Sequence, residues 1–141
     1  MVLRAPERKG PFPAREFFYM KRLTETKEVY WLFTLKINPG QEEAFRKISA
    51  KLIASTQEET GAMNYEWSLS PDGGTCHIYE RYVDSEAVKI HRQRNGQLVK
   101  ELMTTATAVS FALYGAPSDE VKALMAGRDP LFMQPLGGFA Q

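Results

Sequence analysis

The segment from Glu28 to Ile37 constrains the fold more than any other part of the sequence. It is rich in β-branched and aromatic residues, which is typical of a strand. Alternate residues of a strand point to opposite faces of a sheet, and this segment is apolar on both sides for most of its length. A sheet that faces water on one side carries polar residues there. Both faces are therefore predicted to be buried, and a second copy of the same sheet is the simplest cover for one of them.

Helices and strands alternate in a recognisable order after this first strand. Further strands are predicted over 64–69, 75–82 and 106–114, with helices over 41–60, 85–94 and 97–104. The dipeptide Asn95-Gly96 is expected to interrupt the second helical stretch. The order β-α-β-β-α-(α)-β is the split βαβ pattern of ferredoxin-like domains. The predicted fold class is α+β: a ferredoxin-like βαββααβ unit whose antiparallel four-stranded sheet forms a dimeric α+β barrel.

The two ends of the chain differ from this central unit. We expect an N-terminal arm or extension over 1–27, the ferredoxin-like domain over 28–115, and a C-terminal helix with an apolar tail over 116–141. The tail is expected to pack on the domain or on the partner subunit, because that much apolar surface is unfavourable in water. The arm is either an extension of little consequence or a segment whose aromatic residues dock on a partner: Phe12, Phe17, Phe18 and Tyr19.

Composition and motifs narrow the class of protein. A chain of 141 residues, 43% apolar and 25% charged, suits one soluble globular domain. Its net charge of +1 argues against nucleic-acid or anionic-membrane partners. No apolar run is long enough for a membrane span or a secretory signal, so a cytoplasmic location is expected. The single cysteine excludes an internal disulfide, and the two histidines are too few to predict a metal site. The sequence motifs of phosphate-binding loops and of common hydrolases are absent.

Residues that bear chemistry gather on the second and third predicted strands. By alternation, Tyr65 and Trp67 share one face of their strand, and His77 and Arg81 share one face of the next. We expect the two strands to pool aromatic rings, an imidazole and charged groups on one sheet surface. Such a surface would bind a planar aromatic ligand by stacking, with a few polar groups to orient it. The candidates on these strands are Asn64, Tyr65, Trp67, His77, Tyr79, Glu80 and Arg81.

Each candidate also has a purely structural interpretation, and both stay open here. Trp67 fits core or barrel packing as well as a ligand contact, and His77 fits a cross-strand hydrogen bond as well as a base. Glu80 is held by a helix or a partner group, or it faces the cavity. His91 shares a helix face with Ala87, where a lone histidine commonly makes a structural hydrogen bond.

Several sequence features from Glu28 to Gly115, about 60% of the chain, together resemble a known family. They are the strand followed by Pro39-Gly40-Gln41-Glu42-Glu43-Ala44-Phe45, the run from Tyr79 to Ala87, and His91 one turn later. This combination resembles the antibiotic biosynthesis monooxygenase domain family of the dimeric α+β barrel superfamily. The similarity is greatest to its small quinol monooxygenase-like group.

The resemblance implies a homodimer that oxygenates a small quinol or polyphenol with O₂, without flavin, haem or metal. A base removes a phenolic proton, and the electron-rich anion then reduces O₂. The resemblance assigns the base to His77 or His91, and stacking or hydrogen-bond donation to Trp67 and Tyr79. It leaves anion stabilisation to Asn64 or Arg81, and substrate binding also to Tyr65 and Glu80. A different class stays open: a non-catalytic dimeric barrel that binds or sequesters aromatic metabolites.

Overall fold

The computed structural model describes residues 21–141, which belong to two units. Residues 27–134 form the larger unit, and residues 21–26 and 135–141 belong to the smaller one. In the smaller unit β1 (Lys21–Arg22) pairs antiparallel with β7 (Phe139–Ala140). A 3₁₀ turn, η1 (Leu23–Glu25), follows β1. The four aromatic residues of the predicted arm lie outside the described residues.

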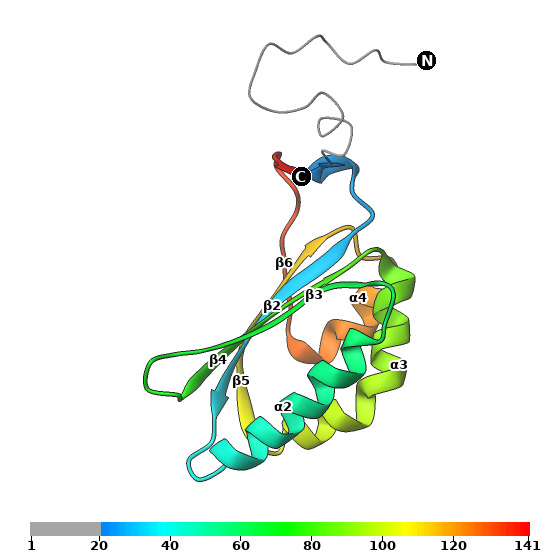
Figure 1. The fold of residues 1–141 in the computed structure, drawn as a ribbon. Coiled ribbons are helices and arrows are strands. Elements are labelled where there is room, and N and C mark those ends of the chain that lie inside the picture. Colours follow the sequence, from blue (N-terminus) through cyan, green and yellow to red (C-terminus); the bar gives the residue numbers. More distant parts are fainter. Residues whose placement is uncertain (1–20) are drawn as a thin grey trace, which may run out of the picture. The chain divides into compact units, whose positions relative to one another are not determined.

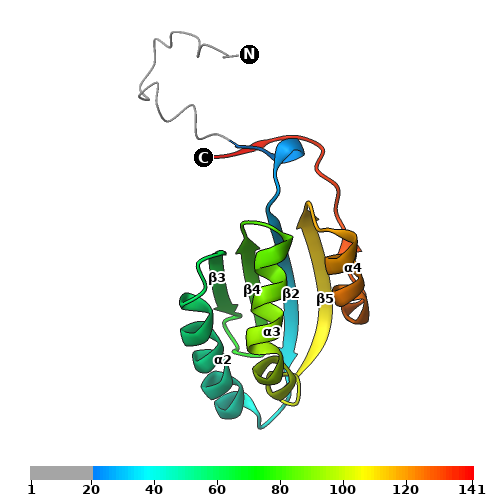
Figure 2. The same cartoon turned by 90° about the vertical axis from the view of Figure 1, so that its right-hand side faces the viewer.

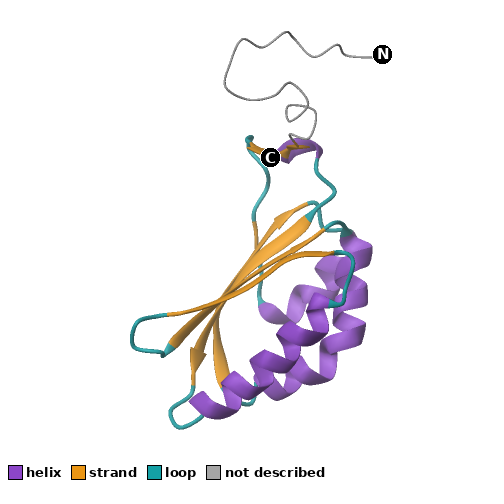
Figure 3. Cartoon of the chain, viewed as in Figure 1, coloured by secondary structure: helices purple, strands orange, loops and turns teal. Residues whose placement is uncertain are grey.

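The larger unit contains an open mixed sheet and three α-helices (Figures 1 and 3). The strand order is β3-β4-β2-β5-β6, in which the first four strands are antiparallel and β6 is parallel to β5. This arrangement confirms the predicted ferredoxin-like α+β fold. The elements are β2 (Val29–Ile37), α2 (Glu42–Gln57), β3 (Ala62–Leu69), β4 (Thr75–Tyr82), α3 (Ser85–Leu102), β5 (Ala106–Gly115), α4 (Asp119–Met125), the 3₁₀ turn η2 (Ala126–Arg128) and β6 (Leu131–Phe132).

The helices of the larger unit all lie on one face of the sheet (Figure 2). Alternate residues of β2, from Val29 to Ile37, are buried on this helix-covered face against Phe45 and Leu52 of α2. The opposite face, which we call the outer face, carries no helix in the described part of the chain (Figures 1 and 2). There β2 presents half-buried side chains that include Tyr30 and Leu32. One apolar face of the first strand is thus covered within the chain, and the closed dimeric barrel stays a prediction.

The predicted break at Asn95-Gly96 is wrong, because α3 runs without interruption from Ser85 to Leu102. The Asn95 side chain is fully buried and donates to the His91 carbonyl one turn earlier and to Glu59 beyond the end of α2. These contacts hold the segment in the helix and offset the low helix propensity of the dipeptide. None of the helices within residues 21–141 is long and apolar enough to cross a bilayer.

The hairpin between β3 and β4 fixes which side chains meet on the helix-covered face. Its turn is closed by Asp72, whose carboxylate accepts from the Gly74 N–H, while Gly73 takes a positive φ of 75°. The resulting register pairs Tyr65 with Glu80 and Trp67 with Ile78. Residues directly opposite each other in a ladder share a face, so these side chains all point toward the helices.

Candidate functional site

A cavity of about 490 Å³ lies between the helix-covered face of the sheet and α3, α4 and η2. All of its lining residues belong to the larger unit. Its wall is mainly aromatic and aliphatic on the sheet side, whereas α3 contributes the imidazole of His91 and several polar groups. The sheet contributes Trp31, Phe33, Tyr65, Trp67, Ile78 and Glu80.

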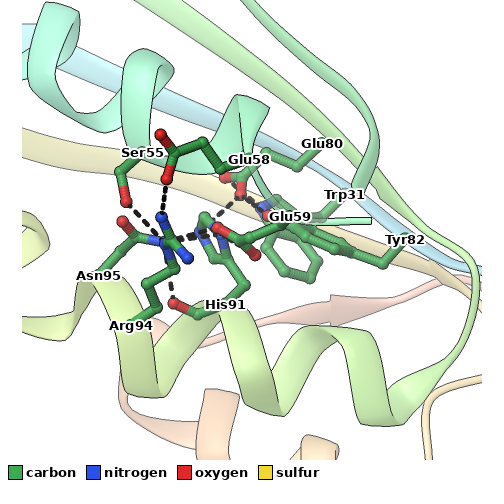
Figure 4. A network of polar contacts seen from close by, with 9 residues as sticks. All are labelled: Trp31, Ser55, Glu58, Glu59, Glu80, Tyr82, His91, Arg94 and Asn95. Carbon is green, nitrogen blue, oxygen red and sulfur yellow. Dashed lines mark hydrogen bonds and ion pairs between the residues drawn. The ribbon is translucent and has the colours of Figure 1, made fainter. Parts of the chain in front are cut away.

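Glu80 is a buried carboxylate at the sheet wall of this cavity, only 4% exposed. The β2–β4 register pairs it with Trp31, whose indole Nε1–H donates to Oε2 at 2.7 Å. The hydroxyl of Tyr82, two residues along the same strand face, donates to Oε1 at 2.7 Å (Figure 4). Two donors therefore fix the carboxylate and stabilise its charge in the protein interior. Burial raises the pKa of Tyr82 well above its usual value, and the nearby Glu80 charge raises it further, so Tyr82 stays a donor.

The imidazole of His91 lies between two carboxylates (Figure 4). Its Nδ1 is 3.1 Å from Oε2 of Glu59, and its Nε2 is 3.5 Å from Oε1 of Glu80. Asn95 donates to the same Glu59 oxygen at 2.8 Å. A proton on Nδ1 matches the Glu59 acceptor and leaves Nε2 with a lone pair toward Glu80. A proton taken up at Nε2 would lie next to a second carboxylate, an arrangement suited to a general base.

The indole of Trp67 provides a hydrogen-bond donor without an acceptor. Its Nε1 is buried, and it has no hydrogen-bond partner among the described residues. An unsatisfied buried donor costs about 1–3 kcal/mol, so a ligand oxygen that accepts from it is stabilised. Trp67 lines the cavity and packs edge-to-face on Tyr65, whose ring in turn contacts His91. Burial, followed by the Glu80 charge, raises the pKa of Tyr65 far above its usual range, so its phenol stays protonated.

The other predicted site residues occupy the outer face of the sheet. The β3–β4 register pairs Asn64 with Arg81 and places His77 on the same face, where its side chain is exposed. Arg81 forms an ion pair with Glu28 at 2.8 Å and donates to the Tyr79 hydroxyl at 3.1 Å. None of these residues lines the cavity. The predicted pooling of Tyr65 and Trp67 with His77 and Arg81 on one surface is therefore wrong, because the pairing register sends the two pairs to opposite faces.

The structure thus brings together Tyr65, Trp67, Glu80 and His91. It separates these four residues from Asn64, His77, Tyr79 and Arg81. The residues that contact or line the site without having been predicted include Trp31, Glu59, Tyr82, Asn95 and Arg128.

Some of these missed residues carry a signal in the sequence. Tyr82 shares the alternation parity of Glu80 on one strand, and Asn95 follows His91 by four residues on one helix. Glu59 and Arg128 carry no such local signal. They are far in sequence from the site residues around them, and only the folded chain brings them together.

Cys76 lies outside the cavity, buried in the core of the larger unit. Burial raises the pKa of its thiol to about 11, so the thiol is protonated at neutral pH. Within residues 21–141 no group of three or more His, Cys, Asp or Glu side chains is placed to hold a metal ion.

Comparison with known proteins identifies a relative by sequence and solved structures with a similar fold. "Putative monooxygenase Rv0793" from Mycobacterium tuberculosis is 33% identical over 90 residues, which span 60% of this chain and 86% of the relative. The crystal structure of MupZ from Pseudomonas fluorescens superposes with a TM-score of 0.73 at 23% identity, over 82% of this chain and 96% of that one. SnoaB from Streptomyces nogalater, described as a cofactor-independent oxygenase, gives a TM-score of 0.56 at 16% identity, over 66% and 96% of the two chains. These two structures show a shared fold.

The sequence model of one family covers β2 to most of α3. It is described as antibiotic biosynthesis monooxygenase, and it matches residues 29–99, about half of the chain. The matched segment contains the Glu80–His91 pair and both cavity tryptophans. The chain belongs to the antibiotic biosynthesis monooxygenase family.

Proposed function

We propose that this protein is a cofactor-independent monooxygenase that oxidises a small quinol or polyphenol with O₂ in the cavity on the helix-covered face. Family membership and the oxygenase descriptions of two similar proteins support this reaction class. The observation that carries the proposal is the geometry of one cavity wall. There His91, held between two buried carboxylates, lies in the same aromatic enclosure as the unpartnered N–H of Trp67.

Proton removal is the first step of the proposed reaction. A phenolic hydroxyl of the substrate gives its proton to Nε2 of His91, which lines the cavity and lies 3.5 Å from Oε1 of Glu80. The imidazolium so formed lies between the carboxylates of Glu59 and Glu80, which stabilise its charge. Asn95 and Trp31 keep those carboxylates in place. The site therefore favours the charge distribution that develops as the substrate loses its proton.

The transfer of oxygen is the second step, in which the deprotonated substrate reacts with O₂. The substrate anion gives one electron to O₂, and recombination forms a C–O bond to a ring carbon, which then carries a hydroperoxide. Cleavage of the O–O bond and of the C–H bond at that carbon releases water and leaves a quinone carbonyl. One oxygen atom enters the product and the other enters water, whose hydrogens come from the phenolic O–H and the ring C–H. The Trp67 N–H stabilises the substrate oxygen while it carries negative charge.

We also propose a homodimer formed through the outer face of the sheet. This face presents Leu32 and the stacked rings of Tyr30 and Tyr114, whose centroids are 5.3 Å apart. The sheet of a second subunit stacked on this face would cover its apolar and aromatic surface. Because the arrangement is two-fold symmetric, the same surface is covered on both subunits. The enzymatic cavity lies on the other face, so each subunit would hold a complete site.

Oxygen uptake tests the proposed reaction. Purified protein, treated with chelator to remove metal, is incubated with a panel of hydroquinones in an oxygen electrode, and products are analysed after reaction with ¹⁸O₂. The proposal predicts uptake above the autoxidation rate for at least one quinol, with one labelled atom in the quinone. Binding of these compounds without uptake above autoxidation would instead support the non-catalytic aromatic-binding barrel.

A further inference from the structure

The segment after β5 adds a cation to the cavity from outside the family-matched residues 29–99. Arg128 is the last residue of η2, and its guanidinium carbon lies 4.8 Å from the ring centroid of Phe33 and 5.2 Å from that of Phe111. The next residue, Asp129, ends the turn in a left-handed conformation with φ of 50°. The turn and the two aromatic rings therefore hold the guanidinium at the cavity.

Arg128 interacts with the Glu80 charge but forms no ion pair with that carboxylate. Among the residues that the structure describes, no side chain or carbonyl forms a hydrogen bond or an ion pair with it. Removal from water lowers the pKa of Arg128, the Glu80 charge opposes that effect, and the neighbouring Arg92 lowers the pKa further. A half-buried guanidinium without an ion-paired anion leaves its hydrogen-bonding capacity unused on the cavity side, so an anion that enters the cavity would be stabilised.

The other charges around the cavity favour an anion in the same way. Besides Arg128, the lining includes Arg92, whose side-chain contact is with the sulfur of Met125, and Lys100. The lining contains one carboxylate, Glu80, and that group already accepts from Trp31 and Tyr82. The lining thus carries three cations and one carboxylate, while the Glu59 carboxylate next to His91 already accepts from Asn95, so positive charge is in excess and the cavity attracts anions.

We propose that the substrate is an aromatic quinol that carries a carboxylate, and that Arg128 binds this carboxylate. The planar guanidinium presents two parallel N–H groups that match the two oxygens of a carboxylate. The aromatic side chains of the cavity wall bind the substrate ring, and the Arg128 guanidinium determines which end of the substrate lies next to η2. The quinol part of this substrate class rests on the proposed oxygenase function, whereas the carboxylate part rests on Arg128 and the charges of the lining.

Binding of three matched probes tests the carboxylate separately from the oxidation. Under anaerobic conditions, quenching of tryptophan fluorescence gives the Kd of 2,5-dihydroxybenzoate, of its neutral amide and of 1,4-dihydroxybenzene. We expect the carboxylate to bind at least about tenfold more tightly than either neutral probe, the usual effect of a hydrogen bond between charged groups. In Arg128→Met this preference disappears while the Kd of 1,4-dihydroxybenzene stays within about twofold, and Arg128→Lys retains part of it.

The matched control is Arg46→Met, which removes the same charge from an exposed position on α2 away from the cavity. It should retain the full preference for the carboxylate. Thermal unfolding without ligand should show Arg128→Met to be as stable as the unmodified protein or more so, because the lone charge is gone. Equal Kd values for the three probes, or a preference that survives Arg128→Met, would overturn the inference. Oxygen uptake from neutral quinols together with such a result would leave the proposed oxygenase function intact.

Discussion

Replacing Glu59 by glutamine tests whether the buried polar cluster around His91 is organised by charge. The carboxylate accepts from Asn95 at 2.8 Å and contacts Nδ1 of His91 at 3.1 Å, and its side chain is only 4% exposed. A hydrogen bond to a charged group contributes about 1.5–3 kcal/mol, and a neutral one about 0.5–1.5 kcal/mol, so two weakened bonds amount to about 2 kcal/mol. Relief from burying a charge offsets part of this loss. We expect Glu59→Gln to lower the free energy of unfolding by about 1–2 kcal/mol.

Urea unfolding followed by circular dichroism measures that change, and the melting temperature should fall by roughly 4–8 °C. The adjacent Glu58 provides the control, because its side chain is 73% exposed and its ion pair with Arg94 lies at the surface. A surface pair of this kind contributes little, so Glu58→Gln should change stability by less than about 0.5 kcal/mol. Equal losses in the two variants, or a Glu59→Gln protein as stable as the original, would refute the assignment of a stabilising charge to Glu59.

Three further predictions follow from burial. Tyr65 and Tyr82 have raised pKa values, so the folded state binds their protons more tightly than the unfolded state does. Their contribution to the free energy of unfolding is therefore fully present below pH 10 and is lost as the pH rises above it. The slope of that fall, measured by urea unfolding between pH 9 and 11, should be smaller in Tyr65→Phe, and an unchanged slope would contradict the assignment. Cys76, with a thiol pKa of about 11, should react with Ellman's reagent at pH 8 only in denaturant, and rapid labelling of the native protein would contradict its burial. Leu32→Glu on the outer face should dissociate the proposed dimer in light scattering, whereas Ile53→Glu, exposed on α2, should not; a stable 16.0 kDa monomer in the unmodified protein would end the dimer proposal.

The sequence was sufficient for the ferredoxin-like order of the main strands and helices, because these elements carry their own periodic signals. The first strand, the helix after Gly40 and the hairpin closed by Asp72 each follow from local patterns. The break at Asn95 was mispredicted because a tertiary contact to Glu59 overrides the local preference. The short strand β6 is only two residues long, which leaves no periodicity to detect.

The candidate site was harder to predict because alternation shows which residues share a face, not which face meets the helices. Trp67 and His77 were grouped on one surface, and only the β3–β4 register separates them. Glu59 contacts His91 across 32 residues, and Trp31 contacts Glu80 across 49. Pairs so far apart leave no mark on a local pattern. Arg128 was missed for the same reason, since only the fold brings η2 to the cavity.

The two histidines of the chain allow the most direct measurement of the proposed mechanism. His91 is buried in the cavity wall, whereas His77 is exposed on the outer face. Using the quinol with the highest oxygen uptake, kcat is measured for His91→Gln and His77→Gln after thermal unfolding shows that both variants are folded. Loss of a general base predicts a fall in kcat of about 10²–10⁴-fold for His91→Gln, and His77→Gln should stay within about twofold. Full activity in His91→Gln, or a comparable loss in His77→Gln, would contradict the assignment of His91 as the base.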